Sequence, residues 1–270
     1  METHPLDEAL RLERLEEGLW RGAPAHAYAN MAGPFGGWTA AILLNAVMLD
    51  ERRLADPIAL TVNYCAAILA EPFVIEAKLQ RGGRTTQHWS LELKQEGAVA
   101  ATASVVCGVR KPVWSHAAAR ASEAPRWDAL PRASMAERPE LTRRYDMRFA
   151  AGGLDDFPRA DGEIRSARSL VWLQDFPARP LDFPALAALS DAFFVRIMVA
   201  RGTWQPMATV TLTSYFHLGG EELRALGPAP LLGEADGAVF RGGFADQSCS
   251  LWSEDGRLVA NGVQATWYKE

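Results

Sequence analysis

The segments RGGRTTQHWSL (81–91) and RGGFADQSCSL (241–251) decide the fold that we predict for this chain. They share Arg-Gly-Gly, Gln and Ser-Leu at one constant offset of 160 residues. Each segment is followed by a tight turn, QEG at 95–97 or EDG at 254–256, and then by an Ala- and Val-rich stretch, which is the spacing of a β-hairpin. Chance does not readily place so many identities at one offset. We therefore predict an internal duplication rather than two unrelated domains.

The elements around this motif also recur in order. Residues 36–49 and 184–200 are apolar, charge-poor helix candidates, which indicates that other parts of the chain enclose them. After the first helix, strand-like segments follow at 58–68, 73–81, 85–95 and 98–109. In the second half, strands are predicted at 145–150, 163–174, 207–217, 238–244, 247–253 and 258–268. The pattern therefore predicts an α+β chain in which each half combines a buried helix with antiparallel strands.

The stretch that joins the halves has a different composition. Between residues 112 and 144 the chain is rich in Ala, Pro, Arg, Glu and Ser and has no sustained helical or strand period. We interpret it as a linker that lies over the surface and is partly helical at best. The expected division is an N-terminal domain at 1–114, a linker at 115–144 and a C-terminal domain at 145–270.

Charge and composition exclude several classes of function. The net charge is -5 and no block of Lys and Arg occurs, so nucleic acid is not an expected partner. No run of about 18 apolar residues and no secretory signal is visible, so we expect no membrane span and a cytoplasmic location. The three cysteines are far apart and are interpreted as reduced core thiols, and the five histidines lack metal-ligand spacing. We expect neither a metal nor another cofactor.

Three further motifs carry a resemblance to a known family. They are Phe35-Gly36-Gly37 at the start of a helix, a Thr-rich strand that ends in Tyr215-Phe216-His217, and a last strand that contains Val263-Gln264. Together they resemble the double-hotdog acyl-CoA thioesterases of the thioesterase II group. The resemblance implies two antiparallel sheets, each wrapped around a long central helix, with an acyl-CoA thioester bound between the two hotdog domains. It also implies a homodimer.

The resemblance further implies the residues of a catalytic site. In that family a helix Asp, a strand Ser or Thr, and a Gln of the last strand hold and activate a hydrolytic water. These roles fall on Asp191, Thr209 and Gln264 of this sequence. The chain departs from the family pattern after Thr209, where Thr211-Leu212-Thr213 replaces an Asp-His pair and Ser. The choice among the three threonines therefore stays open at this point.

Elementary chemistry assigns roles to these residues. Asp191 is the only charge between residues 182 and 196, which favours a desolvated carboxylate that can act as a base. Thr209, Thr211 and Thr213 alternate and are expected on one face of a strand, so Thr211 is a candidate substrate contact. The backbone N–H groups of Gly36 and Gly37 begin a helix and are expected to face a thioester oxygen or a phosphate.

The first half of the chain provides an internal comparison. Aligned by the repeat, Asp191 corresponds to Asn45 and Gln264 corresponds to Val105, so the polar trio occurs once. Hydrolysis of an acyl-CoA thioester is the function that we predict. A non-catalytic protein that binds acyl-CoA or an acyl carrier is the alternative. A hotdog hydratase is disfavoured, because no histidine stands a few residues from an Asp at the start of either predicted helix.

Overall fold

The structure is a computed structural model that describes residues 3–135, 138–154 and 157–270. Its N-terminal half supplies six strands of a curved sheet, namely β1 (Glu13–Glu16), β2 (Leu19–Gly22), β5 (Pro57–Tyr64), β6 (Phe73–Gly82), β7 (Thr86–Gln95) and β8 (Ala98–Gly108). The C-terminal half supplies β9 (Tyr145–Ala151), β10 (Ser169–Asp175), β11 (Met207–Phe216), β12 (Leu231–Asp236), β13 (Phe240–Arg241), β14 (Phe244–Trp252) and β15 (Leu258–Tyr268). Each pairing of neighbouring strands is antiparallel.

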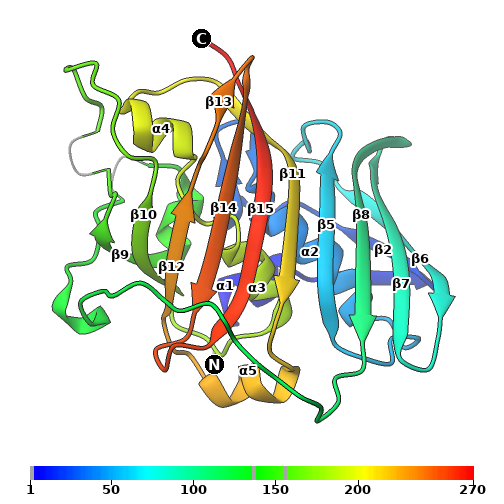
Figure 1. Cartoon of the computed structure of the whole chain (residues 1–270). Helices are drawn as coiled ribbons and strands as arrows, with labels where there is room; N and C mark the ends of the chain where they lie inside the picture. The colour runs from blue at the N-terminus through cyan, green and yellow to red at the C-terminus, as the bar shows by residue number, and fades with distance from the viewer. Residues whose placement is uncertain (1–2, 136–137, 155–156) are drawn as a thin grey trace.

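The two half-sheets join edge to edge. Over the described residues the order is β1-β2-β6-β7-β8-β5-β11-β15-β14-β12-β10-β9, with β13 beside β14 (Figure 1). At the seam Thr61 of β5 lies opposite Thr213 of β11, and their Oγ1 atoms are 3.0 Å apart. The α+β double-hotdog fold is confirmed, and its two sheets form one continuous surface.

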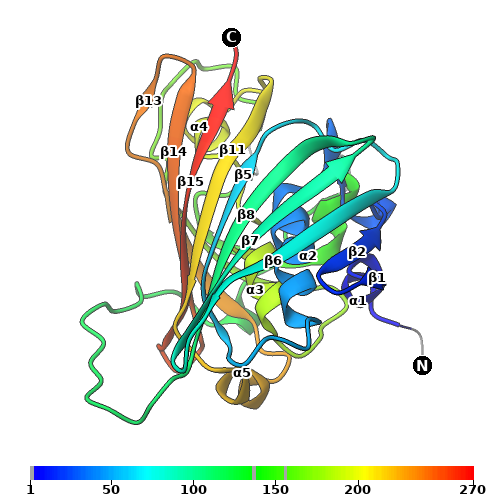
Figure 2. The ribbon, with the colours of Figure 1, turned by 90° about the vertical axis from the view of Figure 1, so that its right-hand side faces the viewer.

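The central helices lie on the concave side of this sheet, as Figure 2 shows. The first central helix, α2 (Gly36–Met48), confirms the helix predicted at 36–49. Its Trp38 is completely buried and donates to the Ala9 carbonyl at 3.0 Å, while Asn45 donates to the Leu10 carbonyl at 2.9 Å. These two bonds fasten the N-terminal segment, including α1 (Pro5–Ala9), to the inner layer.

The second central helix differs from the prediction, because it is broken. In place of one helix at 184–200 the structure has α3 (Phe183–Leu189) and α4 (Arg196–Arg201), with a non-helical stretch at 190–195. Ser190 bonds back to the Leu186 carbonyl at 2.8 Å, which competes with continuation of the helix. The aromatic and β-branched run of Phe193, Phe194 and Val195 also has low helix propensity. The break leaves Asp191 just beyond the end of α3.

The glutamines of the repeated motif have equivalent structural roles. Gln87 accepts from the Leu54 N–H and donates to the Arg52 carbonyl, both at 2.7 Å, just after α2. Gln247 accepts from the backbone N–H and the Nε of Arg196, at 3.3 and 3.2 Å, in the segment after α3. Each glutamine therefore holds the chain that leaves a central helix.

The same pairings correct the predicted alignment of the halves. Gln87 lies opposite Cys107, whereas Gln247 lies opposite Gln264. The counterpart of Gln264 is therefore Cys107 and not Val105. Cys107 is buried, so the conclusion that the polar group occurs in one half alone survives the correction.

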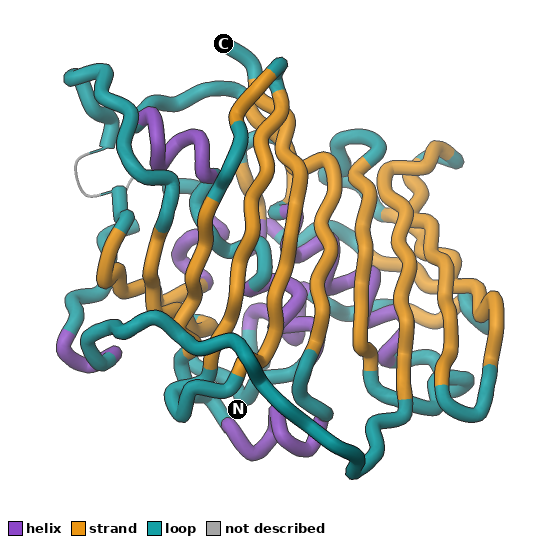
Figure 3. Tube along the Cα trace, viewed as in Figure 1, coloured by secondary structure: helices purple, strands orange, loops and turns teal. Residues whose placement is uncertain are grey.

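The predicted linker lies across the convex face of the C-terminal half-sheet (Figure 3). Trp172 of β10 donates to the Pro125 carbonyl at 2.9 Å, and Ser122 bonds to the carboxylate of Glu234 on β12. The 3-10 segment η2 (Trp127–Ala129) packs against the same cluster as Trp172, whereas Leu141 of the later 3-10 segment η3 (Glu140–Arg144) is buried in the main core. Residues 136–137 of the linker lie outside the described part.

Several smaller elements were not predicted. They are the helices α1 and α5 (Gly220–Leu226), the strands β1, β2 and β12, the 3-10 segment η1 (His26–Tyr28), and a hairpin of β3 (Ala29–Asn30) and β4 (Gly33–Pro34). The strand expected at 238–244 contains only the two residues of β13, and the strand expected at 163–174 begins at Ser169. No helix of the described residues is both long enough and apolar enough to cross a membrane.

Candidate active site

Five of the six residues proposed from sequence converge where the two halves meet. Thr209 of β11 donates to the Oε1 atom of Gln264 on β15 at 3.3 Å. A Cβ atom built on Gly36 would lie 2.7 Å from Oδ2 of Asp191 and 3.6 Å from Oγ1 of Thr209. Gly37, the next residue of α2, presents its N–H to the Asp191 carboxylate. The N-terminal half thus contributes the start of a helix, and the C-terminal half contributes the polar side chains.

A β-bulge separates Thr209 from the other two threonines. Thr209 lies opposite Thr266 and Thr211 lies opposite Ala265, so Val210 is an extra residue in β11. Thr209 therefore shares the inner face with the buried Leu212, while Thr211 and Thr213 occupy the outer face. The prediction of one hydroxyl stripe is wrong at this bulge. The structure places Thr211 away from the other site residues.

Asp191 is an unusual carboxyl group. Its exposed fraction is 7%, and burial raises its pKa to about 7, although the Gln264 side chain and the Gly37 N–H both act in the opposite direction. Because Oε1 of Gln264 already accepts from Thr209, the amide nitrogen is the atom that can donate to Asp191. A carboxyl group with this pKa exchanges a proton readily near neutral pH.

The two glycines are required by close contacts. At Gly36 a side chain would collide with the Asp191 carboxylate at 2.7 Å, and at Gly37 it would collide with the Ala188 carbonyl and the Phe35 ring, both at 2.6 Å. The start of α2 can therefore approach α3 and Asp191 only without side chains. This contact brings the free N–H groups and the positive end of the helix dipole to the site.

Tyr64 is a site residue that the sequence did not reveal. Its hydroxyl donates to the Gly36 carbonyl at 2.7 Å. Burial, together with the charge of Asp191, raises the pKa of Tyr64 well above its usual value, so the phenol stays protonated. Tyr64 ends β5 in the run Thr-Val-Asn-Tyr, which reads as ordinary strand sequence. Only the pairing of β5 with β11 brings it to the site.

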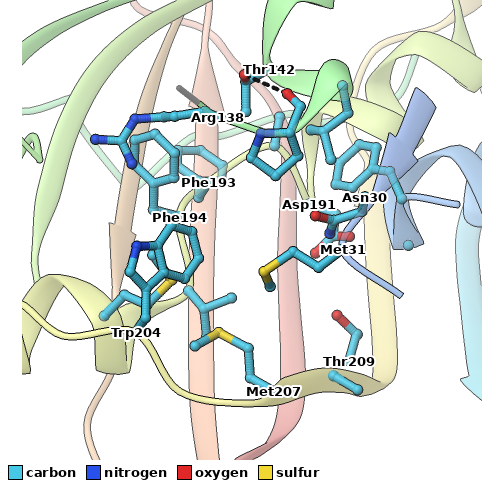
Figure 4. A pocket seen from close by; sticks show the side chains of 18 of the residues that line it. Asn30, Met31, Arg138, Thr142, Asp191, Phe193, Phe194, Trp204, Met207 and Thr209 are labelled. Carbon is cyan, nitrogen blue, oxygen red and sulfur yellow. Dashed lines mark hydrogen bonds between the residues drawn. The ribbon is translucent and has the colours of Figure 1, made fainter. Parts of the chain in front are cut away.

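Two cavities meet at this point. The first, which we name the apolar pocket, reaches from Asp191 into the C-terminal half (Figure 4). Its wall includes Phe193, Phe194, Val195, Met198, Met207 and Leu141. The second, which we name the open groove, runs along Tyr64, Cys65, Ala66, Ala67 and Ile68. Gly36 and Thr209 line both cavities, so they stand at the junction.

The cysteines divide into two groups. Cys107 and Cys249 are buried, and burial raises the pKa of Cys107 to about 11 and that of Cys249 to about 12, so both stay thiols. Cys65 is exposed, and the prediction that it is a core residue is therefore wrong. Within the part of the chain that the structure describes, no cluster of three or more His, Cys, Asp or Glu is placed to hold a metal ion.

Comparisons with known proteins identify the family and the fold of the chain. The model of the acyl-CoA thioesterase C-terminal domain matches residues 116–268, and that of the acyl-CoA thioesterase N-terminal domain matches residues 25–108. A hot dog fold protein of unknown function from Alicyclobacillus acidocaldarius is 38% identical over 100% of this chain and 99% of its own, with a TM-score of 0.94.

Two further structures share the fold at lower identity. A putative thioesterase II from Thermobifida fusca YX has 19% identity and a TM-score of 0.85 over 100% of this chain and 99% of its own. An acyl-CoA thioesterase II from Mycobacterium marinum has 23% identity and a TM-score of 0.76 over 98% of each chain. A search of curated proteins gives no match.

Proposed function

The chain belongs to the acyl-CoA thioesterase family, and from this premise we propose that it hydrolyses an acyl-CoA thioester to a free acid and CoA with Asp191, Thr209 and Gln264. The observation that carries the proposal is the buried Asp191 carboxyl, whose pKa is raised to about 7, beside a Thr-Gln pair and the start of a helix. Each of these features serves a reaction in which water attacks a carbonyl carbon.

In the proposed reaction the Asp191 carboxylate removes a proton from a water molecule. The water oxygen forms a bond to the thioester carbon, and the carbonyl oxygen becomes an oxyanion. Free N–H groups at the start of α2, that of Gly36 first among them, stabilise this charge. The C–S bond then breaks, and the CoA thiolate takes the proton back from Asp191. Thr209 and Gln264 orient the water and the carboxylate.

The two cavities offer complementary environments for the substrate. The apolar pocket suits the acyl group because its wall is built from aromatic and Met side chains. The open groove suits the polar pantetheine arm because it is bordered by exposed loop residues 65–67. The thioester then lies at the junction, beside Gly36 and Thr209.

Binding without turnover is the competing function, and the burial of Asp191 argues against it. Keeping an ionised carboxylate out of water destabilises the folded chain. A protein that only binds an acyl group gains nothing from that cost, whereas a hydrolase gains a base. Homodimer formation and a cytoplasmic location stay predictions.

Release of free CoA thiol from hexanoyl-CoA tests the proposal directly. Wild-type protein should release thiol catalytically, and Asp191→Asn should bind the substrate with little turnover. Binding by both proteins without thiol release from any acyl-CoA would favour the non-catalytic alternative.

A further inference from the structure

We infer that the apolar pocket accepts acyl groups of about six carbons, and that a partition of Arg138, Phe194 and Trp204 sets this limit. The inference rests on the proposed function and adds the class of substrate. It assigns chain-length selection to Arg138 in the linker, Phe194 in the break of the second helix and Trp204 in the loop between α4 and β11.

The size of the apolar pocket gives the number of carbons. Its volume is about 130 Å³. An engineered protein cavity of roughly 150 Å³ takes up one benzene ring, which has six carbons. A short linear chain or one ring therefore fills the space between Asp191 and the far wall.

The far wall separates the apolar pocket from another cavity. That cavity has a volume of about 440 Å³ and borders residues 133–135, Phe149, Leu154 and 157–158. The two cavities share Arg138, Phe194 and Trp204 and no other lining residue among those described. Figure 4 shows these three side chains grouped at one end of the pocket, away from Thr209.

Contacts on the far side hold the partition in place. The Phe194 ring stacks on Phe149 with a centroid distance of 5.8 Å and an interplanar angle of 9°. The Arg138 guanidinium lies 5.0 Å from the Phe194 centroid and donates to the Leu154 carbonyl at 3.2 Å. Trp204 meets the Phe157 ring edge-on at 5.1 Å. A longer acyl chain would have to displace these packed groups or remain in water.

The partition should therefore cause a break, at about six carbons, in the dependence of kcat/KM on the length of the acyl chain. Each methylene group that the pocket buries should raise kcat/KM by up to roughly fourfold. Beyond about six carbons, additional methylene groups find no further space and this gain should stop or reverse. Opening the partition should connect the two cavities and move the break to longer chains.

The test is a series of linear acyl-CoA substrates with 2 to 16 carbons, used below the concentrations at which they form micelles. For the wild type, kcat/KM should rise to hexanoyl-CoA and be at least tenfold lower for palmitoyl-CoA.

Phe194→Ala and Trp204→Ala should each move the optimum by two or more carbons. Trp204 is 47% exposed, so its replacement leaves the fold intact even if Phe194→Ala does not. Phe244→Ala is the matched control, because Phe244 is 52% exposed on β14, outside both cavities.

The outcomes separate the two proposals. A shift of the optimum in either partition variant, with none in Phe244→Ala, supports the inference. Wild-type protein that hydrolyses palmitoyl-CoA as fast as hexanoyl-CoA overturns the length limit but leaves the thioesterase proposal standing. An unchanged chain-length profile in folded Trp204→Ala and Phe194→Ala excludes the partition as its cause. If no substrate of the series is hydrolysed, the proposed function fails and the inference fails with it.

Discussion

Replacement of Asp191 by Asn should lower the activity and raise the stability of the protein. Burial raises the pKa of Asp191 into the range of a base, and the same burial destabilises the folded state when the carboxylate is ionised. Asn keeps the size of the side chain but cannot accept a proton from water. Loss of a general base typically lowers kcat by about 100-fold to 10,000-fold. In the wild type, kcat/KM should fall as the pH drops through about 7, where Asp191 becomes protonated and stops acting as a base.

The stability effect has the opposite sign. The pKa of Asp191 rises from 3.8 to about 7 on folding, and one pKa unit corresponds to about 1.36 kcal/mol, so the ionised group costs the folded state about 4 kcal/mol. A raised carboxyl pKa means that this cost is absent below about pH 4, grows between about pH 4 and 7, and is complete above pH 7. The Asn side chain avoids the cost but gives up one hydrogen bond, which offsets about 1 kcal/mol.

The assay is a pair of melting temperatures beside the rate measurement. In a chain of this size each kcal/mol moves Tm by roughly 2 to 4 °C. Asp191→Asn should therefore melt several degrees above the wild type at pH 8 and with little difference at pH 4. Other titrating groups are common to both proteins and cancel in the comparison. A folded variant with near-wild-type kcat would refute the base assignment, and an equal Tm difference at both pH values would refute the buried-charge reasoning.

The remaining predictions use kcat on hexanoyl-CoA and Tm as readouts. Gln264→Ala should lower kcat at least tenfold, whereas Asn45→Ala should lower only Tm, because Asn45 bonds to the Leu10 carbonyl; equal losses of kcat would contradict this asymmetry. Thr209→Ala should lower kcat about tenfold while Thr211→Ala leaves it unchanged, since the two lie on opposite faces of β11; a larger loss in Thr211→Ala would reverse the assignment. Gly36→Ala should greatly reduce kcat because its Cβ would meet Asp191 at 2.7 Å; normal turnover would show that the helix start does not need to be so close.

Much of the fold could be predicted because the same order of helix-like and strand-like patterns occurs twice in the sequence. The strand predicted at 258–268 matches β15, and those predicted at 73–81 and 85–95 differ from β6 and β7 by one residue at one end. The order of elements in the C-terminal half also implies strands before the first helix of the N-terminal half, since β9 and β10 precede α3. Those strands are β1 and β2, which were missed because β1 is exposed throughout and has no apolar alternation.

The details of the site could not be predicted, because they depend on contacts distant in sequence. Periodicity at 184–200 indicates one helix, and the sequence does not show that Asp191, just beyond the break, meets the Gly37 N–H and Gln264. Alternation at 207–217 indicates one face for three threonines, and the extra Val210 is evident only from the pairing with β15. The family resemblance nevertheless selected Thr209, the threonine that the bulge turns inward.

The two halves of the chain differ in their central helices, and each helix contributes differently to the candidate site. In the N-terminal half α2 runs unbroken for 13 residues, and its contribution to the site is made by glycines and backbone N–H groups. In the C-terminal half α3 ends after seven residues, and the shortened helix leaves Asp191 directed at the start of α2. The proposed site thus takes its glycines and backbone N–H groups from the start of α2 and its carboxylate from the end of α3. A single hotdog domain of this chain would therefore contain only half of the residues of the proposed site. The pairing of β5 with β11 brings the two groups of residues together.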